Sequence, residues 1–272
     1  IDWHHELYTR TVLDIYCDND NNVWFGTLNH GIVHYNSATK VFGTLTEKEG
    51  LSNNHVRSIT QDNSGSLWFG TSGGGICNYF GKLFTTYDVS SGLGGNYIYS
   101  VFRDSKQRLW IGTSQKGLTL FSQSRFSTYS AQNGFADVKV KATAEGNDGW
   151  LYFGTDGQGV YAYNGARFEL IPRLEQIFVR GMVTDKDGVI WMATAGSGLI
   201  KLVPNGTMRP EITFITMRKG VLSNRLTCVH LDRRNRIWYG TDNNGVGVVE
   251  NGRPIRLHIK TKHGLSSNAI RS

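Results

Sequence analysis

Side chains that can hold an acidic or hydroxyl-rich ligand recur at one position of a repeated sequence pattern. Each copy opens with an apolar residue, and the next residue is cationic or aromatic in four copies: Arg57, Tyr99, Lys141 and Arg180. Arg and Lys hold carboxylate or sulfate oxygens through charge-assisted hydrogen bonds, and a Tyr ring can stack on the face of a sugar. Residues beside this position add four candidates: His55, Tyr97, Asn224 and Arg225. We therefore expect a ligand-binding site built from these residues.

The elements that must position these residues follow from six copies of a short phrase. The copies read VWFGT, LWFGT, LWIGT, LYFGT, IWMAT and IWYGT, and their aromatic residues are Trp24, Trp68, Trp110, Tyr152, Trp191 and Trp238. An apolar residue lies twelve positions before each aromatic residue and a glycine seven positions after it, whereas neighbouring copies are 39 to 47 residues apart. Such a period built from short strands is typical of a β-propeller. We predict an all-β protein: a β-propeller of four-stranded blades with six complete repeats.

The repeats run end to end without a linker, which predicts a single β-propeller domain over residues 1–272. Its blade units start near residues 12, 56, 98, 140, 179 and 226, and a partial unit starts at residue 268. Two arrangements stay open: a six-bladed ring, or part of a seven-bladed ring to which residues 1–9 add an outer strand. The sequence starts at Ile1 rather than Met, and we expect it to be a segment of a longer protein.

Aspartates in the first turn of the repeat have a structural interpretation. They recur in five copies, whereas the fourth copy has Gly146 at this place: Asp18, Asp62, Asp104, Asp185 and Asp232. An Asp side chain can accept hydrogen bonds from the backbone of its own turn, so we interpret these residues as turn formers rather than a metal or catalytic set. The six repeated aromatic residues are predicted to pack in the core against neighbouring blades.

Composition narrows the classes of partner. The net charge is +7, but Lys and Arg are scattered, and nucleic-acid binding would need a continuous basic stripe. Cys17, Cys77 and Cys228 form no CxxC motif, so we predict buried free thiols rather than a zinc site or a disulfide framework. No apolar run approaches the roughly 20 residues that cross a bilayer, so no direct membrane insertion is expected. We assign no metal and no cofactor.

A second motif lies between the blades. It reads Gly50-Leu51-Ser52-Asn53-Asn54 before the second blade, and related segments start at Gly92, Val221 and Gly264. Joined to the DxxGxLWxGTxxGGL pattern and a closing Tyr, it resembles the two-component regulator propeller repeat over residues 12–272. The fourth unit departs from the motif at residues 134–137, and the approach to the fifth, residues 173–178, lacks it.

The resemblance implies a role in signalling. Proteins with this repeat are typically extracytoplasmic sensor regions of hybrid two-component histidine kinases, and the best-known group detects oligosaccharides released from polysaccharides. The resemblance therefore implies a non-enzymatic sensing propeller in the periplasmic part of an inner-membrane sensor, with an oligosaccharide or another small molecule as ligand. Its partners would be the neighbouring domains of that sensor, including a second propeller, and a homodimer is left open.

Two other functions stay open. Propeller lyases that act on uronic-acid polymers use His, Tyr and Arg to abstract a proton beside a carboxylate, and His55, Tyr97 and Tyr99 are of the right types. No spacing requires a catalytic pair, however, so we assign no catalytic residue. The third function is a scaffold for protein–protein contacts, in which the cations would only hydrate the surface.

Overall fold

The computed structural model describes residues 10–114, 116–136 and 138–272. The chain divides into two compact units of similar size. The N-terminal unit comprises residues 1–132 and 136–139, and the C-terminal unit comprises residues 133–135 and 140–272.

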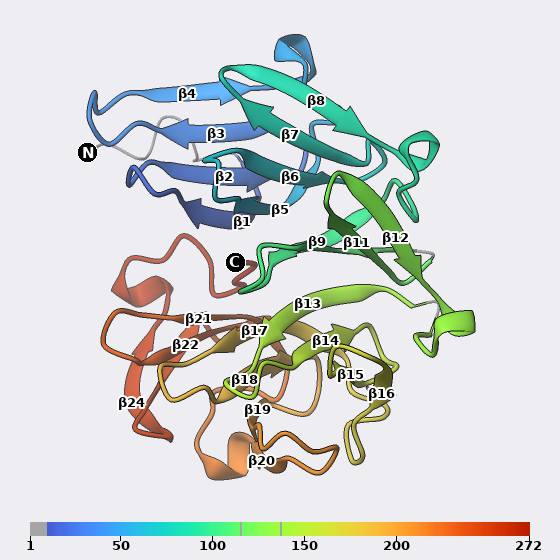
Figure 1. Ribbon diagram of the computed structural model, residues 1–272. Coiled ribbons are helices and arrows are strands. Elements are labelled where there is room, and N and C mark those ends of the chain that lie inside the picture. Colours follow the sequence, from blue (N-terminus) through green and yellow to red (C-terminus); the bar gives the residue numbers. More distant parts are fainter. Residues whose placement is uncertain (1–9, 115, 137) are drawn as a thin grey trace. The chain divides into compact units, whose positions relative to one another are not determined.

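The N-terminal unit contains three four-stranded antiparallel sheets, whose strands pair in chain order (Figure 1). Blade 1 consists of β1 (Val12–Cys17), β2 (Val23–Thr27), β3 (Ile32–Tyr35) and β4 (Phe42–Leu45). Blade 2 consists of β5 (Val56–Gln61), β6 (Leu67–Thr71), β7 (Ile76–Phe80) and β8 (Leu83–Tyr87). Blade 3 consists of β9 (Ile98–Arg103), β10 (Leu109–Thr113), β11 (Leu118–Ser122) and β12 (Arg125–Tyr129).

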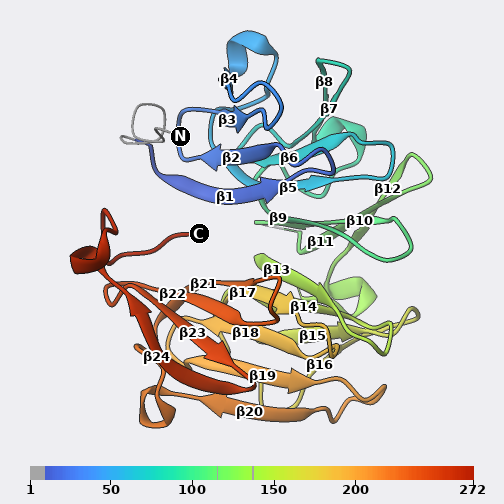
Figure 2. The same cartoon turned by 90° about the vertical axis from the view of Figure 1, so that its left-hand side faces the viewer.

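The C-terminal unit repeats this arrangement in three further sheets (Figure 2). Blade 4 consists of β13 (Val140–Glu145), β14 (Leu151–Thr155), β15 (Val160–Tyr163) and β16 (Phe168–Leu170). Blade 5 consists of β17 (Val179–Thr184), β18 (Ile190–Thr194), β19 (Leu199–Val203) and β20 (Glu211–Ile215). Blade 6 consists of β21 (Leu226–Leu231), β22 (Ile237–Thr241), β23 (Val246–Glu250) and β24 (Arg253–Ile259).

The fold is an all-β propeller with six four-stranded blades, as the repeat predicted. The described residues contain only five helices, each a 3₁₀ helix of three residues: Glu47–Glu49, Val89–Ser91, Ala131–Asn133, Met217–Lys219 and Thr261–His263. None of the helices in this part of the chain has the length and apolarity to span a membrane. The predicted outer strand in residues 1–9 lies outside the described residues, and the single-domain arrangement stays a prediction.

A threonine at the end of each second strand explains the fixed spacing to the following glycine. Its Oγ1 donates to the carbonyl of that glycine at 2.7 to 3.3 Å in all six blades: Thr27, Thr71, Thr113, Thr155, Thr194 and Thr241. The glycine itself packs against the fourth strand. At Gly75, φ is +75°, and an added Cβ would lie 2.2 Å from the Tyr87 carbonyl oxygen. The turn therefore closes tightly because its last residue lacks a side chain. We call the segments between the second and third strands the glycine turns.

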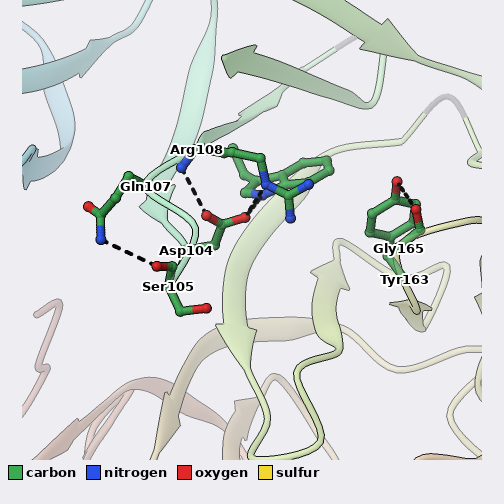
Figure 3. Close-up of polar contacts among 7 residues, drawn as sticks. Asp104, Ser105, Gln107, Arg108, Tyr163 and Gly165 are labelled. Atoms are coloured by element: carbon green, nitrogen blue, oxygen red, sulfur yellow. Dashed lines mark hydrogen bonds and ion pairs between the residues drawn. The ribbon is translucent and has the colours of Figure 1, made fainter. Parts of the chain in front are cut away.

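The repeated aromatic residues are tied to the segments between the first and second strands, which we call the aspartate turns. The indole Nε1 donates to Oδ2 of the turn aspartate at 2.7 to 2.9 Å in five blades. Asp104 also accepts hydrogen bonds from the backbone N and the Nε of Arg108, at 2.9 and 2.6 Å (Figure 3). In blade 4, where Gly146 replaces the aspartate, the Tyr152 hydroxyl donates to Asp148 Oδ2 at 2.9 Å. One carboxylate thus holds both the turn and the core aromatic residue in every blade.

Burial confirms the predicted core with two corrections. Five of the six repeated aromatic residues are less than a tenth exposed, but Trp238 in blade 6 is only half-buried. The prediction of three buried thiols is wrong for Cys17, which is exposed, whereas Cys77 is buried.

The GLSxN motif links successive blades through its last asparagine. In four segments the side-chain Oδ1 accepts the first backbone N–H of the preceding 3₁₀ helix: Asn54, Asn96, Asn224 and Asn268. The carbonyl of the same residue accepts the last glycine N–H of the preceding blade's glycine turn at 2.8 to 3.0 Å. The recurring asparagine is therefore explained by backbone hydrogen bonding between blades.

Candidate functional site

A β-bulge occurs near the start of every first strand. In blade 2, Val56 pairs with Thr71 and Ser58 pairs with Gly70, so Arg57 has no residue opposite it. The same irregularity occurs in the other five blades. The six bulge residues, which are all half-buried, are Leu13, Arg57, Tyr99, Lys141, Arg180 and Thr227. Four of them are predicted site residues. A bulge re-aims the extra side chain and is often found near functional sites.

Bulge residues of neighbouring blades meet in the N-terminal unit. The Arg57 guanidinium lies over the Tyr99 ring, with its central carbon 5.0 Å from the ring centre. Its Nε donates to the Ser72 hydroxyl in the glycine turn of blade 2. The cation is thus held between an aromatic face and a hydroxyl. Arg57 has no carboxylate partner in the part of the chain that the structure describes, and its charge stays uncompensated there.

Two further predicted residues lie beside Arg57 in sequence or space. Tyr97 pairs with Ser72 through an isolated antiparallel bridge and is 53% exposed. Its ring lies over Gly73, where an added Cβ would be 3.7 Å from Tyr97 Cζ. The glycine turn of blade 2 and the segment that leads into blade 3 therefore lie side by side. A large aromatic side chain remains open to solvent where they meet.

His55 has a different environment. Its Nε2 is buried without a hydrogen-bond partner. Burial lowers the pKa of the imidazole below its ordinary value, and the positive charge of Arg57 lowers it further. The ring is consequently neutral at pH 7.

The C-terminal unit brings together Lys141 and Arg180 around one carboxylate. Arg180 Nη1 donates to Asp156 Oδ1 at 2.7 Å, and Lys141 Nζ lies 3.8 Å from Asp156 Oδ2. Asp156 belongs to the glycine turn of blade 4, at the position that Ser72 occupies in blade 2. Asp156 is not among the eight predicted site residues, although the sequence already indicates that its turn lies at the end of the blade where the first strand begins. The contacts of Asp156 with Lys141 and Arg180 are what the structure adds.

Phe178 is the counterpart of Tyr97 in this unit. It pairs with Asp156 through an isolated antiparallel bridge, and it is 48% exposed. Its ring lies against Gly157, where an added Cβ would be only 2.5 Å from Phe178 Cε1. Gly157 has φ of +100°, so its missing side chain serves both the turn and the close approach of the ring. Phe178 is not among the eight predicted site residues, because the segment before blade 5 lacks the GLSxN motif.

The last two predicted residues are engaged with the backbone or with a carboxylate. Asn224 accepts the Met217 N–H through its side chain, at 2.9 Å. The largely exposed Arg225 side chain contacts Asp242 in the glycine turn of blade 6, with 2.7 Å between Nε and Oδ2. An exposed ion pair of this kind contributes little to stability. It nevertheless reduces the positive charge that the sequence alone suggests for this region.

The eight predicted residues thus fall into groups within each unit. His55, Arg57, Tyr97 and Tyr99 belong to the N-terminal unit, and Lys141, Arg180, Asn224 and Arg225 belong to the C-terminal unit. Bridges such as the one between Ser72 and Tyr97 place a glycine turn beside the start of the next first strand. The glycine turns lie at the opposite end of each sheet from the aspartate turns, because consecutive strands are antiparallel. The candidate residues therefore gather at one end of their blades.

A small cavity lies at the other end of blades 5 and 6. Its volume is about 160 Å³, and its polar lining includes Asp185, Asp187, Trp191, Lys201, Asn235 and Asn251. Asp185 accepts the Trp191 indole N–H at 2.7 Å, and Lys201 Nζ lies 5.9 Å from the centre of the same ring. The Asp185 carboxylate also accepts the N–H groups of Asp187 and Val189, so it already holds the aspartate turn. No group of three or more His, Cys, Asp or Glu residues arranged for a metal ion occurs among the described residues.

A family comparison identifies the repeats. The family model of the two component regulator propeller matches residues 9–29, 50–73 and 92–115. Three segments, all within the first 115 residues, therefore match this repeat, as the GLSxN and LWFGT motifs indicated for them. A comparison with curated protein sequences finds no match.

Solved structures with a similar fold include extracellular domains of proteins from B. thetaiotaomicron. The extracellular domain of one protein described as a hybrid two component system is 19% identical, with a TM-score of 0.68 over 96% of this chain and 42% of that chain. A second extracellular domain of this description is 18% identical, with a TM-score of 0.68 over 89% of this chain and 38% of that chain. The chain thus spans less than half the length of these two structures. At such low identity the likeness shows the fold alone.

An enzyme shares the fold as well. A catalytically inactive variant of virginiamycin B lyase from Staphylococcus aureus, solved with quinupristin, is 15% identical to this chain. The TM-score is 0.73, over 93% of this chain and 86% of the lyase. Because extracellular domains of two component systems and a lyase both have this fold, function has to be argued from the side chains at the candidate site.

Proposed function

We propose that this chain is a non-catalytic recognition module in the extracytoplasmic part of a two-component sensor, and that it binds an oligosaccharide. The observation that carries the proposal is the set of bulge residues. The bulge recurs in every blade, yet its side chain changes from Leu13 to Arg57, Tyr99, Lys141, Arg180 and Thr227. Varied side chains on a constant frame are typical of binding positions on a rigid scaffold.

The chemistry of these side chains favours a sugar ligand. Oligosaccharides offer hydroxyl groups that both donate and accept hydrogen bonds, together with apolar ring faces that stack on aromatic side chains. Tyr97 and Phe178 supply exposed aromatic rings, and Arg57, Arg180 and Asp156 supply polar groups beside them. The two component regulator propeller repeats support a role in signalling, which would be exerted through neighbouring domains of a larger membrane sensor.

Binding can be tested with a panel of neutral and acidic oligosaccharides derived from polysaccharides. A ligand at 100 times its dissociation constant should stabilise the folded chain by about 2.7 kcal/mol, which raises the melting temperature measurably. The combined change Arg57→Ala and Tyr99→Ala should weaken a ligand held in the N-terminal unit, whereas Arg180→Ala tests the C-terminal unit. A ligand whose affinity survives all of these changes would move the binding site away from the bulge residues.

A lyase is the second candidate, and His55 is the observation that favours it. A neutral imidazole with an unpartnered Nε2 can accept a proton at pH 7, and Arg57 is close enough to influence its pKa. The test is incubation with uronic-acid polymers while the absorbance of unsaturated uronates is followed. The sensor proposal predicts no turnover, whereas turnover that is abolished by His55→Ala would establish an enzyme.

A further inference from the structure

We propose that Phe178, Asp156 and Arg180 form a subsite for a neutral, hydroxyl-rich sugar ring in the C-terminal unit; this inference rests on the proposed oligosaccharide binding. The sequence leaves both an acidic and a hydroxyl-rich ligand open for this region, and the two cationic residues Lys141 and Arg180 would suit an acidic one. The contacts between these side chains point to a different ligand chemistry.

The ring of Phe178 provides the apolar part of the subsite. One part of it is held against Gly157, and almost half of the side chain remains exposed. An apolar side chain of this size is usually buried, and its exposure beside polar groups is typical of a surface on which a ring-shaped ligand stacks. Because the glycine backbone supports the ring, little conformational freedom would be lost on binding.

The polar part of the subsite is an ion pair rather than a free cation. Asp156 accepts a hydrogen bond from Arg180 Nη1 at 2.7 Å and lies within ion-pair distance of Lys141 Nζ. Their side chains remain partly exposed, 22% for Asp156 and 33% for Arg180. Each group therefore keeps surface through which it can contact a ligand. The carboxylate reduces the net charge of these three side chains to +1.

This pairing selects hydroxyl groups over carboxylates. A sugar hydroxyl can donate to Asp156 and accept from Arg180, so adjacent hydroxyls satisfy both members of the pair. A carboxylate can only accept, and close to Asp156 it would meet a like charge. The corresponding turn residue in the N-terminal unit is Ser72, which carries no charge. Discrimination against carboxylates is therefore expected in the C-terminal unit only.

The experiment is calorimetric titration of the full chain with neutral oligosaccharides of glucose, galactose, mannose and arabinose, and with oligogalacturonides. We expect binding of a neutral oligosaccharide, which Phe178→Ala and Phe178→Leu should each weaken about tenfold, because both remove the stacking ring. Phe178→Leu retains apolar bulk and guards against misfolding. Phe80→Ala is the matched control, since Phe80 is also an exposed Phe at a strand end; it should leave the affinity unchanged.

Asp156→Asn supplies a readout that a purely structural residue would not give. Removing the carboxylate takes away the ion-pair partner of Arg180, so the affinity for oligogalacturonides should rise while that for the neutral ligand falls. Neutral binding that is unaffected by the changes at Phe178 and Asp156 would overturn this subsite and leave oligosaccharide recognition standing. A wild-type preference for oligogalacturonides that Arg180→Ala abolishes would overturn the neutral assignment. Absence of binding to every probe would contradict both the subsite and the proposed function.

Discussion

At the scale of single residues, the hydrogen bond between each core indole and a turn carboxylate joins two features that the sequence displays separately. The recurring aspartates were interpreted as turn formers, and they do accept backbone N–H groups, as in Asp104. Their second task, accepting the indole N–H, was not foreseen. Blade 4 shows how the two tasks depend on each other, because Tyr152 finds its acceptor in Asp148 instead. A buried polar group of this kind requires a partner.

Replacing a core aromatic residue should therefore cost most where it is fully covered. Trp110→Ala is expected to lower the free energy of unfolding by about 3–5 kcal/mol, because it empties a buried site and removes the indole donor from the Asp104 carboxylate. Trp238→Ala should cost less, since Trp238 is half-buried although it makes the same hydrogen bond to Asp232. Denaturant unfolding followed by circular dichroism measures both values. Equal costs would mean that burial does not decide the difference.

Asp14 should make stability depend on pH. Burial raises the pKa of its carboxyl group from 3.8 to about 7, although hydrogen bonds from the Ile59 and Ile15 N–H groups act in the opposite direction. The folded chain therefore holds this proton more tightly than the unfolded chain does. The resulting stabilisation is complete below a pH of about 4 and is lost as the pH rises towards 7.

The measurement is thermal unfolding of the parent and of Asp14→Asn between those two pH values. The contribution that declines with rising pH should be present in the parent and absent from the variant, which cannot titrate at this position. Other titrating groups are shared by both proteins and cancel in the comparison. Parallel curves for the two proteins would show that Asp14 does not carry the effect.

At the scale of elements, the repeat determines most of what can be predicted from the sequence. Apolar starts, aromatic centres and closing glycines predict the strands of all six blades, because each spacing corresponds to a hydrogen bond such as the one from Thr71 to Gly75. The candidate position was also recognisable by alignment of the repeats, but not as a β-bulge. The sequence indicates that the turn with Asp156 lies at the same end of the blade as Lys141, but not that its carboxylate pairs with both Lys141 and Arg180, because these contacts depend on side-chain conformation.

The glycine turns offer a test at this scale. Gly75→Ala should be strongly destabilising, because the new methyl group would lie 2.2 Å from the Tyr87 carbonyl oxygen and the backbone would have to move. Gly81→Ala is the matched control. Gly81 also has positive φ but has no atom within 4 Å of an added Cβ, so its substitution should cost only about 1–2 kcal/mol. Equal losses of stability would mean that the close approach to the fourth strand is unimportant.

At the scale of the whole molecule, six blades with one repeated pattern carry different side chains at the same end of each sheet, the end with the glycine turn. The carboxylates of the aspartate turns hold the core aromatic residues, as Asp62 holds Trp68, whereas the glycine turns lie beside the varied bulge residues and the exposed rings of Tyr97 and Phe178. This asymmetry is the basis of the proposed recognition role. A binding module built in this way keeps its strands constant and places variation where the ligand is held.

The most direct test of this account is hydrogen exchange of the full chain with and without the oligosaccharide that binds most tightly in the panel. The account predicts slower amide exchange on binding at the glycine turns and the starts of the first strands, in residues 55–57, 72–75, 97–99, 156–159 and 178–180. Exchange at the aspartate turns, such as residues 62–66 and 185–189, should not change. Protection confined to the aspartate turns would contradict the account, because it would place the ligand at the opposite end of the blades.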